Sequence, residues 1–340
     1  MADRVIIVGV KRGNERVSTS ELQQMLGRAG RRHGGSTCKA ELIIEDDEYD
    51  EVVLEMKGDG SFDIRSQFDS AESLSFHLLP EICRKELRTL DDVRAWYSRS
   101  FGAFQGKRAK IEKSIEILLE AEAIIETPHG FLATKLGQIA SRMYFHPIDV
   151  KDWKDNFGTI FEMGLECDDV AVSWALGNTS VTRASGDFGK YWHVVSECRG
   201  NLPPGLDMRE GTTITVTLWW SALSGAPVGK MKNHVIAMRD DFERIRTVLC
   251  NIDSEITRWD KVDFFMELAR RIRRGIPAHL ADLCGLPNIS KNRAEYLYNI
   301  GIRDVEGIRD SLSDIESEVD ERFAQALKDI ANGVCRKINR

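Results

Sequence analysis

The sequence has no long apolar run. Nowhere in its 340 residues do about eighteen apolar residues follow one another, the length that a membrane-spanning helix needs. The first residues also lack the pattern of a secretory signal. We therefore expect no membrane association and a cytoplasmic location, or a nucleoid or nuclear one together with nucleic acid.

Paired cysteines and an excess of positive charge are absent too. The seven cysteines form no C-x-x-C pair and no cluster with histidine, which argues against a zinc site and a disulfide framework. We expect no bound metal in this chain. The formal net charge of −7 argues against a nonspecific nucleic-acid coat. Local basic patches can still bind anions, because salt confines electrostatic fields to roughly 10 Å.

The chain lacks the elements that hold the phosphates and magnesium ion of ATP. No G-x-x-x-x-G-K-[ST] loop occurs. Residues Gly102 to Arg108 come nearest, but the segment is one residue too short and lacks the terminal hydroxyl. The acidic run Glu45 to Glu48 is predicted to be a solvated turn. We expect neither ATPase activity nor a bound cofactor from this chain alone.

A glycine- and arginine-rich segment, residues 24 to 35, is the most informative part of the sequence. Arginines can stabilise the charge that develops on a transferring γ-phosphate, by a factor of about 10³ to 10⁵. Flanking glycines let the backbone approach phosphates closely. The alternative for such a segment is a solvated basic loop.

The spacing Q-x-x-G-R-x-G-R in this segment resembles the last conserved motif of Ski-like superfamily 2 helicases. The resemblance implies that Gln24, Arg28 and Arg31 are catalytic and face ATP, with Gln24 orienting the γ-phosphate or the attacking water. It also implies that Gly27, Arg28, Gly30 and Arg31 bind the nucleotide. A complete helicase of this type would use ATP and Mg²⁺.

The segment lies between two predicted strands, Arg4–Val10 and Ala40–Ile44. Ser18 and Glu21 form a helix-start signal before it. This order resembles the end of the second RecA-like motor domain, which we assign to residues 1–75. Two strands cannot bury a parallel sheet on both faces, so further strands come from elsewhere or the segment packs differently.

Residues 76–150 combine helices with one hairpin. Ile111, Ile115 and Leu118 have the spacing of one helix face, and a turn at 127–130 separates two short strand-like runs. Helices followed by a β wing suggest a winged helix. The segment Thr134–Tyr144 resembles the helix that closes this domain in Ski-like helicases, where the domain is a hinge.

Residues 151–275 are predicted to form a helical bundle. Within it, the sequence does not decide whether Thr212–Thr217 forms a strand or a helix. The clearest helix runs from Met231 to Asn251, and its apolar face contains Val235, Phe242, Ile245 and Leu249.

Two basic groups belong to this region. Lys232, Arg239 and Arg246 recur every seven residues and form a stripe that could follow the phosphates of a single strand. The alternative is an exposed, solubilising face. Similar helicases carry a ratchet helix here. Arg270, Arg271, Arg273 and Arg274 make the densest basic cluster and are the best candidates for contact with a nucleic-acid backbone.

Residues 276–340 resemble the helix-hairpin-helix module that ends this helicase branch. The frame L-x-x-L-P-x-I-x-x-x-x-A-x-x-L-x-x-x-G-I is met from Leu283 to Ile302. Asn288 and Ser290 stand at the two positions where the family has glycine, and they are our candidates for phosphate contact in the hairpin. The alternative is a purely structural hairpin.

We therefore expect a mainly α protein with a small α/β part, namely the end of a RecA-like domain, a winged helix, a ratchet bundle and a helix-hairpin-helix. The resemblance to the HelQ type of Ski-like helicase implies single-stranded or forked nucleic acid as partner, DNA favoured over RNA. A second partner would be a motor-domain polypeptide that carries the phosphate loop. The rival interpretation is a non-enzymatic nucleic-acid-binding or protein-docking remnant of a helicase.

Overall fold

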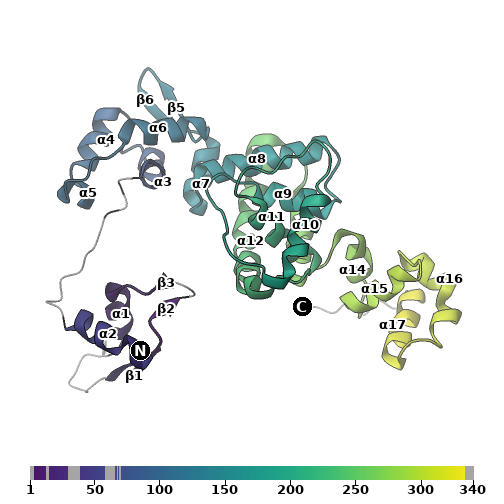
Figure 1. Ribbon diagram of the computed structural model, residues 1–340. Coiled ribbons are helices and arrows are strands. Elements are labelled where there is room, and N and C mark those ends of the chain that lie inside the picture. The colour runs from purple at the N-terminus through teal and green to yellow at the C-terminus, as the bar shows by residue number, and fades with distance from the viewer. Residues whose placement is uncertain are drawn as a thin grey trace. The chain divides into compact units, whose positions relative to one another are not determined.

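The computed structural model divides the chain into two compact units, Met1–Gln67 and Phe68–Arg340 (Figure 1). The protein is mainly helical with a small sheet part, as the sequence predicts. The residues that the structure describes are 4–12, 15–29, 39–57, 66, 68 and 70–333.

The first unit is built on two parallel strands, which pair in register from Arg4↔Lys39 to Val8↔Ile43. The predicted order of strand, helix and strand is confirmed. Each strand ends one or two residues earlier than predicted. The elements of this unit are β1 (Arg4–Val8), β2 (Lys11–Arg12), β3 (Glu15–Arg16), α1 (Thr19–Leu26), β4 (Lys39–Ile43), the 3₁₀ turn η1 (Asp46–Glu48) and α2 (Tyr49–Met56).

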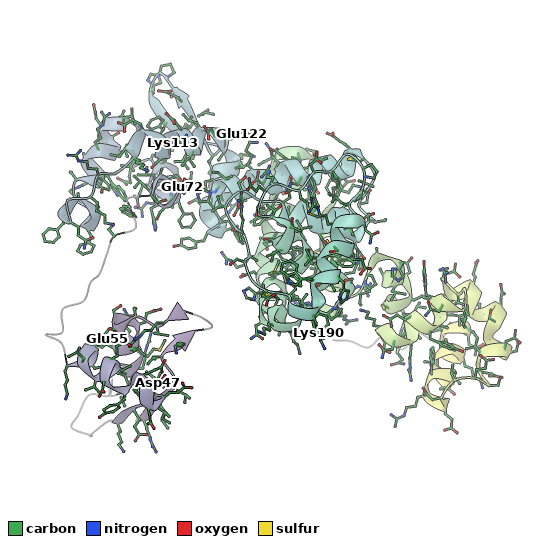
Figure 2. All side chains as sticks on the ribbon, in the orientation of Figure 1. Asp47, Glu55, Glu72, Lys113, Glu122 and Lys190 are labelled. Atoms are coloured by element: carbon green, nitrogen blue, oxygen red, sulfur yellow. The ribbon has the colours of Figure 1, made fainter. Side chains whose placement is uncertain are left out.

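Local signals set the helix of this unit. The Ser18 side chain accepts a hydrogen bond from the Glu21 amide, and the Glu21 carboxylate accepts one from the Ser18 amide, which forms a capping box at the predicted helix start. Glu55 on α2 (Figure 2) accepts hydrogen bonds from Arg16 (3.3 Å) and Thr19 (3.2 Å). These contacts hold β3 and α1 against α2.

Only one face of the two-stranded sheet is covered. The core of the first unit consists of Val10, Val17, Leu22 and Val52, with partly buried neighbours. On the opposite face of the sheet, Ile6 is 49% exposed, Val8 77% and Ile43 55%. A parallel sheet normally has both faces covered. The described residues of this unit thus leave open a sheet face that combines these three apolar side chains with the ion-paired Arg4, Lys39 and Glu41.

The second unit begins with helices and a hairpin. The predicted face of Ile111, Ile115 and Leu118 is buried, and the two strands pair around the predicted turn from Thr127 to Gly130. The boundary that we placed between residues 75 and 76 falls inside the first helix. The elements are α3 (Ala71–Cys83), α4 (Leu90–Tyr97), α5 (Phe101–Phe104), α6 (Ile111–Glu120), β5 (Ile124–Thr127), β6 (Gly130–Ala133) and α7 (Lys135–Met143).

A helical bundle follows, in which α11 packs against both α9 and α12 (Figure 1). Its large apolar core also includes the helices of the preceding segment. The bundle contains α8 (Pro147–Glu162), α9 (Asp169–Gly177), η2 (Gly189–Tyr191), α10 (Trp192–Gly200), α11 (Thr213–Ser224), η3 (Gly229–Met231), α12 (Lys232–Ile252), the π-helical turn η4 (Asp253–Thr257) and α13 (Val262–Arg274).

The segment Thr212–Thr217, which the sequence left open, belongs to helix α11 rather than to a strand. Its threonines find partners inside the bundle. The Thr217 hydroxyl donates to the Thr213 carbonyl (2.8 Å), and the Thr215 hydroxyl accepts from the Ala184 amide (2.8 Å). Tertiary packing therefore overrides the strand preference of β-branched residues.

The last part has an apolar core of its own. The frame residues Leu283, Ile289, Ala294, Leu297 and Ile302 are all buried in it. Its elements are η5 (Ala278–Leu280), α14 (Ala281–Gly285), α15 (Lys291–Asn299), α16 (Val305–Ile315) and α17 (Glu321–Ala331).

Candidate nucleic-acid interface

The arginine motif starts at the end of α1. Gln24 lies in the last turn of the helix with its side chain exposed, and Gly27 caps the helix C-terminus with an ordinary right-handed backbone. The Arg28 side chain is also exposed. Gly30 and Arg31 lie outside the described residues. The structure therefore leaves Gln24 and Arg28 accessible at one end of α1.

The predicted basic stripe on α12 is wrong for its middle residue. Lys232 is exposed, but Arg239 bends toward α11 and donates from Nη2 to the Ala222 carbonyl (3.0 Å). Burial lowers the pKa of Arg239, and its Nε has no hydrogen-bond partner among the described residues. A guanidinium held in this way contributes to packing at the C-terminus of α11. It does not extend a line of free charges along α12.

Arg246, the third residue of that stripe, faces α13. Its Nε donates to Glu243 Oε2 (3.1 Å) and its Nη1 lies 2.9 Å from the Met266 sulfur. The side chain is 24% exposed. Arg246 therefore belongs to the contact between α12 and α13 rather than to an independent stripe.

Of the four clustered arginines on α13, the structure corrects Arg271. Its side chain is buried and pairs with Asp169 at the start of α9, while its Nε donates to the Ile276 carbonyl (3.2 Å). Asp169 also accepts from the Ala278 amide (2.9 Å). Arg271 thus joins three segments of the second unit, and in this position it cannot reach a solvent-exposed phosphate.

The other three arginines of the cluster reach the surface. Arg270 is held by Glu267 through two hydrogen bonds (2.9 and 2.7 Å). Arg273 is 73% exposed and pairs with Glu243 on α12 (2.7 Å). Arg274 is exposed and has no hydrogen-bond or ion-pair partner among the described residues. These side chains remain candidates for phosphate contact.

Packing of α12 on α13 brings the two predicted basic groups together. A cavity of about 230 Å³ between these helices is lined by one acidic, four basic and two apolar side chains: Glu243, Arg246, Met266, Ala269, Arg270, Arg273 and Arg274. We call this set the arginine seam. Sequence spacing alone does not reveal this set, because it is assembled by the packing of α12 against α13. Sequence reasoning also missed Glu243, although it precedes Arg246 by three residues.

Of the two residues that stand at the family's glycine positions, Asn288 has a left-handed backbone and Ser290 an extended one. Asn288 has φ +59°, in the left-handed region that asparagine tolerates better than most residues. Its carbonyl accepts from Arg293 Nη1 (3.0 Å). Ser290 caps α15, and its hydroxyl accepts from the Arg293 amide (3.4 Å). Both side chains are exposed.

Asn288 also borders a groove of about 950 Å³ that our sequence reasoning did not predict. Arg293, Arg322 and Lys328 contribute positive charge to it, and Glu316 and Glu321 contribute negative charge. The groove lies in the last part of the chain, between Asn288 and Lys328. It is a weaker site for a polyanion than the arginine seam, where four arginines face one glutamate.

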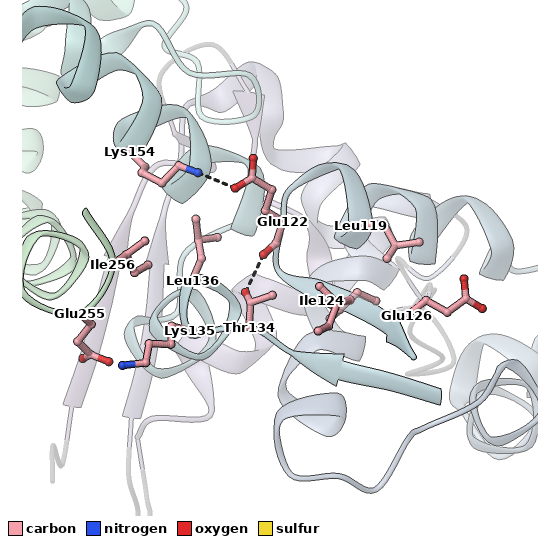
Figure 3. Close-up of a pocket in the computed structure, with 11 residues that line it drawn as sticks. Leu119, Glu122, Ile124, Glu126, Thr134, Lys135, Leu136, Lys154, Glu255 and Ile256 are labelled. Carbon is pink, nitrogen blue, oxygen red and sulfur yellow. Dashed lines mark hydrogen bonds and ion pairs between the residues drawn. The ribbon is translucent and has the colours of Figure 1, made fainter. Parts of the chain in front are cut away.

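Another cavity, of about 750 Å³, lies between the hairpin and the bundle (Figure 3). Lys154 pairs with Glu122 (2.6 Å), whose carbonyl accepts from the Thr134 hydroxyl (2.6 Å). Three glutamates and two lysines line this cavity. The excess of negative charge disfavours a nucleic-acid backbone there.

The described residues contain no helix that is long and apolar enough to span a bilayer.

No protein-family model matches the chain. It is 24% identical over 352 aligned positions to the ATP-dependent DNA helicase Hel308 of Thermococcus kodakarensis, covering 90% of this chain and 30% of that protein. It is 26% identical over 328 positions to the Hel308 of Pyrococcus abyssi, covering 88% and 45%. Over most of its length the chain is similar to these Hel308 helicases. The similarity corresponds to a C-terminal helicase segment.

The Hel308 of Caldivirga maquilingensis is 30% identical over 162 positions, which is 43% of this chain and 21% of that protein. The chain spans less than half the length of each of these relatives. The predicted resemblance to a C-terminal segment of a Ski-like superfamily 2 helicase is thereby confirmed, as a similarity to Hel308 proteins along most of the chain.

Proposed function

We propose that the chain supplies strand-handling domains and arginine fingers to an ATP-dependent DNA helicase whose ATP-binding motor half is carried outside these 340 residues. Residues 1–75 would end the second RecA-like domain, 76–150 form a winged helix, 151–275 a ratchet bundle and 276–340 a helix-hairpin-helix. The similarity to Hel308 over about nine tenths of the chain carries this proposal.

The first unit supports the role in ATP turnover. Gln24 and Arg28 are accessible at the end of α1. The same unit leaves Ile6, Val8 and Ile43 uncovered on one sheet face. A motor polypeptide could pair further strands with the edges of this sheet, cover its open face and bring a nucleotide to the arginines. ATP and Mg²⁺ would then be held by the phosphate loop of that polypeptide.

The second unit supports the role in strand handling. The arginine seam contains four guanidinium groups, of which those of Arg273 and Arg274 are exposed, and guanidinium geometry suits paired phosphate oxygens. DNA is the substrate that the relatives' names give. We therefore propose single-stranded or forked DNA as the ligand of the second unit.

Complementation of ATPase activity tests the proposal. The chain alone should not hydrolyse ATP. Mixed with the motor half of the Pyrococcus abyssi relative, which would carry the phosphate loop, it should turn over ATP in the presence of single-stranded DNA. Arg28→Ala or Arg31→Ala should reduce that turnover by about 10³-fold or more. Arg84→Ala, which removes an exposed arginine of the second unit, is the matched control.

Two outcomes would contradict the proposal. Hydrolysis by the chain alone that survives Arg31→Ala would show a different nucleotide site. DNA binding without any turnover in the mixture would favour the non-enzymatic remnant, in which the second unit keeps its role and the arginine motif does not.

A further inference from the structure

The arginine seam holds a carboxylate at its centre. Glu243 accepts from Arg246 Nε through Oε2 (3.1 Å) and from Arg273 Nη2 through Oε1 (2.7 Å). The two arginines come from different helices, α12 and α13. Each carboxylate oxygen therefore serves one guanidinium group, and one anion joins the two sides of the seam.

This arrangement has the same donors and acceptors as an arginine clamp on a phosphodiester. A phosphodiester also offers two charged oxygens, and arginine pairs with carboxylate and phosphate in similar geometry. Among the described residues, Glu243 is the ion-pair partner of Arg273. Whatever anion binds between Arg246 and Arg273 must take the place of the Glu243 carboxylate.

The carboxylate is held loosely enough to be displaced. Its side chain is 42% exposed and that of Arg273 is 73% exposed. Ion pairs in contact with water contribute little to stability, because both partners keep most of their hydration. Arg274 lies beside them without a partner among the described residues and adds positive charge that favours an incoming anion.

We propose that Glu243 is an internal phosphate mimic, which occupies a phosphodiester subsite of the arginine seam. Its carboxylate weakens the binding of single-stranded DNA to the seam until a phosphodiester of the DNA displaces it. The inference rests on the proposed function and adds a residue that sets affinity. On binding, Arg246 and Arg273 exchange the carboxylate for a phosphodiester, and Glu243 moves into solvent.

The variant Glu243→Gln tests this directly with the whole 340-residue chain. It keeps the size of the side chain and removes its charge. Anisotropy of a fluorescent single-stranded oligothymidine should report affinity higher by roughly three- to tenfold at low salt, because the site is vacated and a repulsive charge is lost. The log-log salt slope should steepen by up to about 0.7, the increment for one more neutralised phosphate on a single strand.

Asp241→Asn is the matched control. It removes the same charge from the same helix, two residues earlier, where the carboxylate lies 3.8 Å from Arg244. Its affinity should stay within about twofold of the unmodified chain. Unchanged thermal unfolding would confirm that both variants fold.

A double-mutant cycle separates this inference from the proposed function. In an Arg246→Ala/Arg273→Ala background, Glu243→Gln should have no effect. If the arginine variants weaken binding but Glu243→Gln does not strengthen it, or if Asp241→Asn strengthens it equally, the mimic is wrong and the seam still binds DNA. If every variant has the same DNA affinity as the unmodified chain, Glu243 is not a phosphate mimic and the arginine seam is not the DNA-binding site. The same holds if neither the chain nor its variants bind DNA.

Discussion

The two compact units differ in how completely each encloses its apolar side chains. Among its described residues, the first has a small core around Val10, Val17, Leu22 and Val52 and an exposed sheet face with Ile6, Val8 and Ile43. The second has a continuous core from α3 to α13 and another core in its last helices. The difference indicates that the second unit can fold by itself, whereas the described residues of the first unit leave part of its sheet exposed.

The largest expected effect concerns the buried polar network of the second unit. Arg271→Ala should lower the free energy of unfolding by about 3–5 kcal/mol, because Asp169 would keep a poorly hydrated charge without its partner. Tryptophan fluorescence in urea measures this cleanly, since all seven tryptophans lie in the second unit. Arg28→Ala, in the first unit, should leave the same transition unchanged. A loss below about 1 kcal/mol for Arg271→Ala would contradict the assigned role.

A smaller effect is expected from the exposed arginines. Replacing Arg270, Arg273 and Arg274 together by Ala should lower affinity for single-stranded DNA about tenfold or more and flatten the salt slope by roughly 2, for three lost contacts. Removing Arg84, Arg94 and Arg99, three exposed arginines outside the seam, changes the net charge equally. Equal losses in both triple variants would show that net charge, not the seam, determines binding.

The smallest effect is a pH dependence within the second unit. His146 caps α8 by accepting from the Ile148 amide at Nδ1 (3.3 Å), while Nε2 lies 3.4 Å from the Glu72 carbonyl. Burial lowers the pKa of His146. As pH falls below about 6.5, the unfolded chain therefore takes up a proton before the folded one does, and stability decreases.

Urea unfolding at about pH 7.5 and pH 6 measures that loss. His146→Asn keeps a side chain that can cap the helix but does not titrate, so its stability should vary less between the two pH values. Burial raises the pKa of Asp149, so its contribution has the opposite sign: stability falls as pH rises through its more acidic window. A loss of equal size in His146→Asn would assign the pH dependence to other groups.

Sequence patterns predicted those features that depend on neighbours along the chain. The capping box at Ser18, the apolar face of α6 and the hairpin turn at 127–130 all follow from local spacing, and the structure contains each of them. The family could also be predicted, because the arginine motif has an exact spacing within a few residues.

Features that depend on packing could not be predicted in this way. Arg271 counts as one more positive charge in the sequence, but it lies three residues after the buried Leu268 and turns toward Asp169, which is 102 residues away. Arg246 and Arg273 are brought together only by the pairing of α12 with α13. The contact of Glu243 with Arg273 depends on that helix pairing as well.

Hydrogen exchange along the chain alone is the most direct test of the central claim, that the first unit is incomplete without a motor polypeptide. Amides of β1 and β4 should exchange at least about two orders of magnitude faster than those of α11, because local opening suffices to expose them. Addition of the motor half should slow β1 and β4 and leave α11 unchanged. Protection of β1 and β4 equal to that of α11 without any partner would contradict the account.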